Sequence, residues 1–191
     1  MDPADIQQAF LDAGALLTGH FALSSGLHSD RYLEKFRLIE RPAALEPMCA
    51  DIADRFADSG VEYVLGPTTA GIILAYNVAR YLGVVARFAE PAANGRTLRR
   101  GQTMPAGARV LIVDDILTTG LSVRECMDIV ARGGGDLVGV AILGDRSGGK
   151  ALPGVRLESL LTVEFATYAP EACPLCIAGV PLTKPGTRSA S

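Results

Sequence analysis

The chain has 191 residues, of which 49% are hydrophobic and 20% are charged, and its formal net charge is −3. This composition excludes an intrinsically disordered chain, and the length suits a single domain that buries roughly 70% of its unfolded surface. No excess of Lys and Arg is present to neutralise nucleic-acid phosphates, so we expect no nucleic-acid partner. An anionic ligand would therefore have to be bound by a local group of side chains and N–H groups, because the protein as a whole is not positively charged.

The amino-terminal residues argue against export. Asp2 and Asp5 stand where a secretory signal carries positive charge, so we expect an intracellular, cytoplasmic protein. The longest stretch without a charge, residues 63–79, contains Gly66-Pro67-Thr68-Thr69 and is shorter than the roughly 20 apolar residues of a bilayer span. We therefore expect no contact with a membrane.

Two helices are predicted in the first third of the chain. Asp2 and Pro3 suit the N-cap and first turn of a helix whose apolar spacing continues to about Gly19. Residues 21–39 have a less regular pattern. A second helix is predicted from Pro42 to Gly60, because its apolar residues recur on one stripe.

Short apolar runs then alternate with helical patterns. Strands are expected at residues 62–65, 84–88, 109–113 and 137–143, and a helix at 71–82. Runs this rich in Val, Ile and Leu are typical of buried strands in a parallel sheet. The chain is therefore predicted to be an α/β protein with helices covering a parallel sheet.

Residues 89–107 are predicted to be a long loop, because they contain Pro91, Asn94-Gly95 and two further turn-forming residues. Unstructured loops of this length inside a domain are usually functional or mobile. This one carries Arg96, Arg99 and Arg100. A solvated basic loop is the simpler interpretation, but the motif that follows favours a functional one.

The most informative segment is residues 110–122, in which four apolar residues lead into Asp114 and Asp115 and then into Thr118-Thr119-Gly120. A helix is expected to follow as far as Gly133, with Ser122 and Glu125 forming a capping box. The free N–H groups at its start, together with nearby hydroxyls, suit a phosphate monoester.

The two adjacent acids would repel a bare anion unless they bind hydroxyl groups or a divalent metal. A sugar phosphate satisfies both requirements. The alternative is that Asp114 and Asp115 only cap a turn after a buried strand, as Asp often does.

These residues resemble the phosphoribosyl diphosphate signature of the type I phosphoribosyltransferases. Among them the chain is most similar to the orotate phosphoribosyltransferases, and the likeness extends over most of its length. It is carried by the signature itself, by Gly19 to Tyr32, by Gly66 to Ile72, by Gly144-Asp145-Arg146, and by Cys173-Pro174-Leu175-Cys176 with Lys184-Pro185-Gly186.

The resemblance implies one phosphoribosyltransferase domain over residues 1–191, with a central parallel sheet flanked by helices and a small N-terminal hood. The hood would occupy about residues 1–40, the α/β core about 41–165, and a C-terminal extension about 166–191. The implied activity is transfer of the phosphoribosyl group of phosphoribosyl diphosphate to N1 of orotate, which gives orotidine 5′-monophosphate in pyrimidine biosynthesis. The family also implies a homodimer.

The resemblance also assigns site residues. Catalytic roles would fall to Arg96, Arg99, Arg100, Asp114 and Asp115. Phosphoribosyl diphosphate would be bound by Thr68, Thr69, Asp114, Asp115, Ile116, Leu117, Thr118, Thr119, Gly120, Leu121 and Ser122. Orotate would be bound by Thr118, Arg146 and Tyr32. Arg146 suits the orotate carboxylate because a guanidinium forms two parallel hydrogen bonds with it.

The implied cofactor is Mg²⁺, held mainly by the diphosphate, so no protein ligand is assigned to it. The family's mobile loop usually carries a lysine and a histidine, whereas this loop carries only arginines, which stabilise charge but donate protons poorly. Ser24 stands where many relatives have a lysine, and Leu121 replaces a small residue. A phosphoribosyltransferase for a purine or uracil, or a non-catalytic nucleotide sensor, is the alternative.

Three other features are given structural roles. Residues 144–151 resemble a phosphate-loop ATPase motif, but Ala151 lacks the metal-binding hydroxyl and Pro153-Gly154 would end the required helix, so a loop is predicted. The Cys173-Pro174-Leu175-Cys176 pair has the spacing of half a zinc site, but no second pair stands at ligand spacing. His20 and His28 are expected to be solvated.

Overall fold

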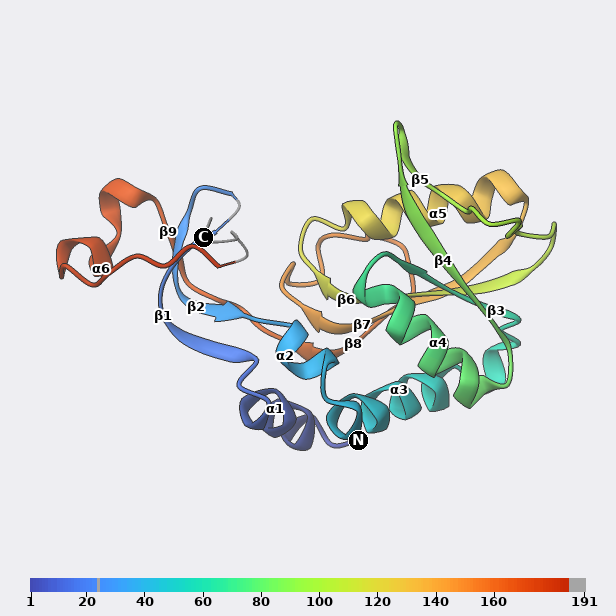
Figure 1. The fold of residues 1–191 in the computed structure, drawn as a ribbon, viewed down its shortest axis with the longest axis horizontal. Helices are drawn as coiled ribbons and strands as arrows, with labels where there is room; N and C mark the ends of the chain where they lie inside the picture. Colours follow the sequence, from blue (N-terminus) through green and yellow to red (C-terminus); the bar gives the residue numbers. More distant parts are fainter. Residues whose placement is uncertain (24, 186–191) are drawn as a thin grey trace.

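A six-stranded sheet lies at the centre of the protein, in the strand order β5-β4-β3-β6-β7-β8 (Figure 1). The computed structural model describes residues 1–23 and 25–185. The pairs from β4 to β8 are parallel, and β5 is antiparallel to β4. The strands are β3 (Tyr63–Pro67), β4 (Val85–Ala92), β5 (Gly95–Thr97), β6 (Arg109–Leu117), β7 (Asp136–Asp145) and β8 (Leu157–Thr162).

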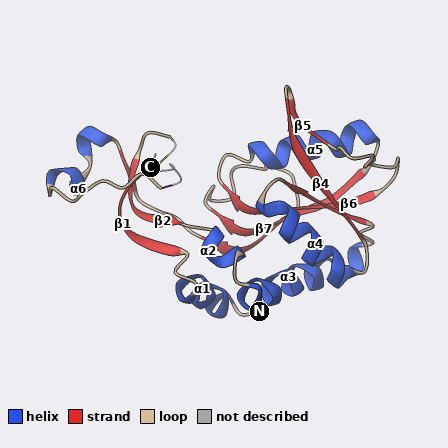
Figure 2. Ribbon diagram, in the orientation of Figure 1, coloured by secondary structure: helices blue, strands red, loops and turns tan. Residues whose placement is uncertain are grey.

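Helices cover both faces of this sheet (Figure 2). Helices α3 (Pro42–Phe56) and α4 (Ala70–Leu82) cover one face, and α5 (Leu121–Gly133) covers the other. Strand β6 supplies both cores, because successive side chains point to opposite faces: Leu111 packs with α3 and α4, and Ile112 packs with α5. The predicted parallel α/β sheet is confirmed.

A second, smaller sheet forms the hood, which stands apart from the core at the left of Figure 1. It contains β1 (Leu16–Ala22), β2 (His28–Leu33) and β9 (Thr167–Tyr168), all antiparallel. The 3₁₀ turn η2 (Pro170–Ala172) and the short helix α6 (Pro174–Ile177) follow β9, and α2 (Phe36–Ile39) leads from the hood to the core. Residues from both ends of the chain therefore build the hood.

The first helix, α1 (Pro3–Asp12), ends well before the predicted limit at Gly19. Asp2 caps it through a hydrogen bond from the Ala4 N–H, as expected. Gly14 has a φ of +63°, which turns the chain out of the helix. The apolar residues that follow form strand β1 instead of continuing the helix. The predicted limit is wrong because a short apolar run is compatible with both a helix and a strand.

The predicted long loop is partly ordered. Strand β4 extends to Ala92 and pairs with β5 across a tight turn, where Gly95 has a φ of +89°. The Asn94-Gly95 pair is typical of a β-hairpin, although only a loop is predicted for these residues. Residues 98–108 are irregular except for isolated turns.

Two predictions about minor motifs have opposite outcomes. The ATPase-like residues 146–151 form turns rather than a helix, as predicted. The histidines are not solvated: His20 is 3% exposed and His28 is 7% exposed, and both face Cys173 and Cys176.

Ser24 and Gly186 lie outside the described residues. No helix among those described has both the length and the apolar character needed to cross a bilayer.

Candidate active site

The predicted site residues gather where the parallel strands β3, β6 and β7 end. Thr68 and Thr69 follow β3, Asp114 and Asp115 lie in the last half of β6, and Arg146 follows β7. Ligands of open parallel sheets bind beyond the carboxyl ends of the strands, because the connecting loops and helix N-termini meet there. The fold therefore brings three separate sequence motifs to one edge.

The acid pair is buried at this edge, with Asp114 at 8% and Asp115 at 3% exposure. The Asp115 N–H donates to Asp114 Oδ1 at 2.9 Å, and the Ile116 N–H donates to Asp115 Oδ1. Lys35 Nζ lies 2.7 Å from Asp115 Oδ2. Asp114 has no ion-pair partner in residues 1–23 and 25–185, so its carboxylate is available to a ligand.

Burial raises the pKa of Asp114 to about 7, and the neighbouring charge of Asp115 adds to the increase. The hydrogen bond from the Asp115 backbone and the positive charges of Lys35 and Arg96 oppose it. Perturbed carboxyl groups of this kind are typical of functional sites. A ligand that donates hydrogen bonds would favour the anion and lower this pKa.

A cavity of about 210 Å³, here called the phosphate cavity, lies over the start of α5. Its lining runs from Thr118 to Val123 and includes Asp114 and Ile116. Gly120 has a φ of +77° and is the N-cap residue, so the helix begins at Leu121, two residues earlier than the predicted capping box at Ser122 requires. That capping box is wrong, because Glu125 instead pairs with Arg96 at 3.1 Å.

The loop beneath the phosphate cavity is braced by Arg124. Its guanidinium donates to the Thr119 carbonyl at 2.7 Å and to the Ala151 carbonyl at 2.9 Å. These bonds use backbone carbonyls and leave the N–H groups at the start of α5 free of Arg124. An ordered cluster of N–H groups at a helix start is a binding site for an anion.

A second cavity of about 430 Å³ lies between the hood and the core, and we call it the hood cleft. Its lining combines Tyr32 and Lys35 from the hood side with Thr118 and Arg146 from the core. Ile116, Thr118 and Thr119 line both cavities, so the two are adjacent. A ligand with a phosphate at one end and a ring at the other fits this arrangement.

Arg146 is positioned by its neighbours. The backbone N–H of Arg146 donates to the Leu117 carbonyl at 2.8 Å, and this hydrogen bond holds the residue at the end of β6. The buried Asp145 carboxylate accepts the N–H groups of Ser147 and Gly149 and so shapes the following turn. The guanidinium lies 5.0 Å from the centre of the Phe165 ring, and burial lowers its pKa.

Tyr32 lines the hood cleft with its ring 5.6 Å from the Phe21 ring, at a tilt of 37°. Burial raises the pKa of its hydroxyl, and so does the charge of Glu34. The phenol is therefore neutral at physiological pH. Tyr32 therefore supplies an aromatic ring to the hood side of the cleft, and the buried Phe21 packs against that ring.

Thr68 and Thr69 form a turn in which Gly66 and Gly71 approach so closely that a Cβ on Gly66 would lie 2.0 Å from the Gly71 oxygen. The Thr68–Thr69 peptide bond is cis. Arg96 donates to Thr68 Oγ1 at 3.1 Å and to the Ala89 carbonyl at 3.2 Å. The structure thus places Arg96 beside this turn, where it can support an anion.

The other two loop arginines point elsewhere in this conformation. Arg99 donates to the Pro91 carbonyl at 3.2 Å, and Arg100 pairs with Glu90 at 3.3 Å. Both are exposed, and Arg100 has a φ of +57°. Their catalytic assignment stays a prediction that requires movement of the loop.

Sequence reasoning missed Lys35 and Arg124. Lys35 follows a hood strand, and no spacing rule connects it to Asp115, which lies 80 residues later. Arg124 occupies an exposed helical position typical of a solvated charge. One feature of the sequence could have indicated its role. Arg124 lies in the first turn of the helix that follows Thr118-Thr119-Gly120, within reach of the backbone carbonyl of Thr119.

Comparisons with known proteins show the family of this chain. Residues 43–156 match the family described as phosphoribosyl transferase domain. The chain is 48% identical to an orotate phosphoribosyltransferase of Pelotomaculum thermopropionicum, over 96% of this chain and 97% of that protein.

Two solved structures are similar in fold. The crystal structure of an orotate phosphoribosyltransferase from Aeropyrum pernix has a TM-score of 0.70 at 25% identity and covers 83% of this chain and 93% of its own. An adenine phosphoribosyltransferase from Thermoanaerobacter pseudethanolicus has a TM-score of 0.62 at 17% identity, with 70% and 88% covered, and shows the fold alone. Together, the acid pair, the two adjacent cavities and these likenesses establish that the chain belongs to the orotate phosphoribosyltransferase family.

Proposed function

We propose that the protein transfers the phosphoribosyl group of phosphoribosyl diphosphate to orotate and releases pyrophosphate, a step of pyrimidine biosynthesis. A bond forms between N1 of orotate and C1 of the sugar, and the bond from C1 to the pyrophosphate oxygen breaks. Pyrophosphate leaves with the electron pair of that bond, and the N1 proton passes to solvent. The observation that carries the proposal is the position of Arg146 in the hood cleft, next to the phosphate cavity and the acid pair.

Arg146 would select the base. Orotate is a pyrimidine with a carboxylate, and a half-buried guanidinium can hold that group through two parallel hydrogen bonds. The Thr118 hydroxyl lies in the same cleft and can bond to the ring. The Tyr32 ring lines the cleft and offers an apolar surface against which the base can pack.

The acid pair and the phosphate cavity would orient the donor. Asp114 and Asp115 can accept hydrogen bonds from the ribose hydroxyls, and the 5′-phosphate can bind at the start of α5. With both ends held, C1 of the sugar lies near the base. Such positioning accounts for a large part of enzymatic rate enhancement in group transfer.

Negative charge develops on the leaving pyrophosphate and requires positive charge around it. Arg96 already stands beside Thr68, at the turn that we assign to the pyrophosphate. We further propose Mg²⁺ as cofactor. The site fits an ion held mainly by the diphosphate, because Asp114 is a hard oxygen donor without an ion-pair partner among residues 1–23 and 25–185, whereas Asp115 is already paired with Lys35. When bound with the diphosphate, Mg²⁺ supplies charge that stabilises pyrophosphate as it leaves.

The direct test mixes the protein with orotate, phosphoribosyl diphosphate and Mg²⁺ and follows the loss of orotate absorbance. We expect turnover with orotate and at most a trace with uracil or adenine, because only orotate presents a carboxylate to Arg146. Donor binding without turnover would instead support a nucleotide sensor, and equal turnover with uracil would contradict the assignment of Arg146.

Replacing Arg96, Arg99 and Arg100 together with alanine is expected to lower kcat by about 100-fold or more, because Arg96 lies at the turn assigned to pyrophosphate and movement of the loop would bring Arg99 and Arg100 to the same side. The dissociation constant for orotate should change little, since the hood cleft is lined by other residues. Steady-state kinetics and isothermal titration calorimetry measure the two effects. An unchanged kcat would show that the loop arginines take no part in the reaction. The control is Arg156→Ala, which removes an arginine outside the loop and should leave kcat unchanged.

We also propose that the protein is a homodimer, supported by an exposed apolar surface on α4. Ile73, Tyr76 and Tyr81 are 40%, 65% and 43% exposed, and burial of these side chains against a second copy would favour association. Tyr76→Glu is expected to convert dimer to monomer in sedimentation velocity. Leu11→Glu, at an exposed position of α1, should leave the dimer intact. A parent protein that sediments as a monomer would contradict the proposal.

We place the protein in the cytoplasm as part of the same proposal. None of the cysteines, at positions 49, 126, 173 and 176, forms a disulfide. Free thiols of this kind persist in reducing compartments.

A further inference from the structure

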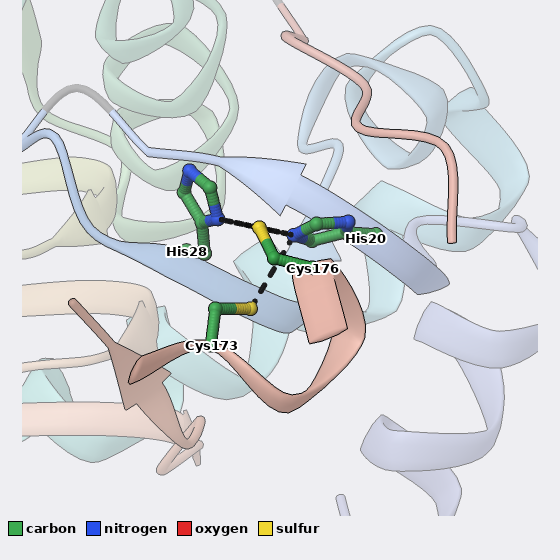
Figure 3. A group of neighbouring side chains, drawn as sticks. All are labelled: His20, His28, Cys173 and Cys176. Atoms are coloured by element: carbon green, nitrogen blue, oxygen red, sulfur yellow. Dashed lines mark hydrogen bonds between the residues drawn. The ribbon is translucent and has the colours of Figure 1, made fainter. Parts of the chain in front are cut away.

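Four side chains that could ligate a metal converge in the hood (Figure 3). One of them comes from α6, which lies beyond the hood sheet on the side away from the α/β core (Figure 1). The four are His20, His28, Cys173 and Cys176, and their ligand atoms all lie within 4.8 Å of one another. His20 Nε2 lies 3.1 Å from His28 Nδ1, and the two cysteine sulfurs lie 3.4 and 3.7 Å from His20 Nε2. Cys176 Sγ also lies 3.3 Å from His28 Nδ1.

The hood hairpin explains how the two histidines meet. Ala22 pairs with His28 across β1 and β2, and His20 stands two residues before Ala22, so both rings project from one face of the sheet. The register shifts by one residue between Thr18 and Phe21. The irregular stretch contains Gly19 and His20, and a bulge of this kind re-aims the side chains within it.

The two cysteines reach the same point from the other end of the chain. Cys173 closes η2 and precedes Pro174, and Cys176 lies in the turn of α6 that follows. The C-x-x-C spacing places both sulfurs on one side of that turn, facing the histidines. The ligands therefore come from three segments, with 144 residues between the second histidine and the first cysteine.

A hydrogen bond outside the cluster fixes the His20 ring. Its Nδ1 lies 2.8 Å from the Val180 carbonyl oxygen, which only accepts, so Nδ1 carries the proton and Nε2 presents its lone pair to the cluster. Histidines that bind metals almost always donate their other ring N–H to a carbonyl or carboxylate in this way. The ring is thus already in the tautomer that a metal requires.

We propose that His20, His28, Cys173 and Cys176 bind one Zn²⁺ ion, which has a structural role in the hood. A tetrahedral site with Zn–S near 2.3 Å and Zn–N near 2.0–2.1 Å has ligand-to-ligand distances of about 3.3–3.8 Å. The four distances given above run from 3.1 to 3.7 Å. Two thiolates and two imidazoles in this geometry select zinc, and four protein ligands leave no open position for substrate.

The ion would join the carboxyl-terminal segment to the hairpin. Beyond α6 the chain runs beside β1: the Thr183 N–H donates to the His20 carbonyl, and the Ala22 N–H donates to the Thr183 carbonyl, each at 2.8 Å. Two residues later Pro185 lines the hood cleft. Zinc at the cluster would therefore stabilise one wall of the proposed orotate site without taking part in the reaction.

The test measures metal in the untagged full-length protein, purified with reductant and dialysed against a buffer that contains Mg²⁺. Inductively coupled plasma mass spectrometry is expected to find about one zinc per chain. Cys176→Ala and His28→Ala should lose at least ten-fold in zinc content. Cys49→Ala and Cys126→Ala remove buried thiols outside the cluster and should keep the full equivalent.

Two measurements on the unaltered sequence keep the test independent of variant folding. Protein reconstituted with Co²⁺ should show the visible absorption of tetrahedral cobalt and a thiolate charge-transfer band. Removal of zinc by a strong chelator should lower the Tm by roughly 5–15 °C, and added Zn²⁺, but not Mg²⁺, should restore it.

Three results would overturn the proposal: a metal-free protein that fails to take up Zn²⁺ or Co²⁺, a full equivalent of another metal, or a cobalt spectrum without thiolate ligation. These readouts do not depend on transferase activity. An inactive protein that holds one zinc would contradict the proposed function and leave the zinc site standing.

Discussion

Replacing Arg146 with alanine is expected to lower kcat/KM for orotate by about 100- to 1,000-fold, because loss of a charge-assisted bidentate pair leaves the substrate carboxylate without a partner. The guanidinium stands in the hood cleft, and the backbone of Leu117 and the turn shaped by Asp145 hold it there. Binding of phosphoribosyl diphosphate should be nearly unchanged, since the phosphate cavity does not include Arg146.

Steady-state kinetics with each substrate varied in turn measure this effect, and calorimetry with the donor measures its binding. Arg146→Lys should recover only part of the activity, because an ammonium lacks the planar fork of a guanidinium. Arg156→Ala removes an exposed arginine before β8 and should retain full activity. Equal losses in orotate and donor binding for Arg146→Ala would show that the residue acts on the fold rather than on the base.

The second large effect is expected at the acid pair. Asp114→Asn and Asp115→Asn should each lower kcat/KM for phosphoribosyl diphosphate by about 100-fold, because hydrogen bonds from hydroxyls to an ionised carboxylate contribute roughly 1.5–3 kcal/mol. Both replacements keep the shape of the side chain. Asp136→Asn, at the exposed start of β7, is the matched control and should behave as the parent.

The pH dependence separates Asp114 from its neighbour. Its pKa of about 7 means that the carboxyl is neutral below that pH and anionic above it. If the anion accepts the sugar hydroxyls, kcat/KM for the donor rises between about pH 6 and pH 8, and Asp114→Asn shows a flatter rise that reflects the substrate phosphates alone. Identical profiles for the parent and for Asp114→Asn would contradict this role.

The same shift has a consequence for stability. A carboxyl whose pKa is raised by folding stabilises the fold most below its unfolded value of 3.8, and this contribution is lost as the pH rises through about 7. Asp114→Asn removes the buried charge, so its Tm at pH 8 in the absence of ligands should equal or exceed that of the parent. A lower activity with an undiminished Tm would then reflect lost binding rather than unfolding.

Local patterns in the sequence determined the central sheet and the acid motif. The apolar runs at β3, β6 and β7 are buried on both faces, and such strands are recognised from their composition without knowledge of their neighbours. The glycine at position 120 and the hydroxyls beside it marked the anion cavity for the same reason, because backbone freedom and side-chain chemistry are local properties.

Contacts between distant segments were decided only by the tertiary structure. The pairing of Lys35 with Asp115, the hood sheet closed by β9, and the meeting of His20 with Cys173 each join residues far apart in the chain, and no spacing rule encodes them. The early end of α1 was missed because apolar residues near Leu16 serve a strand as well as a helix, and the partner strand β2 determined which one formed.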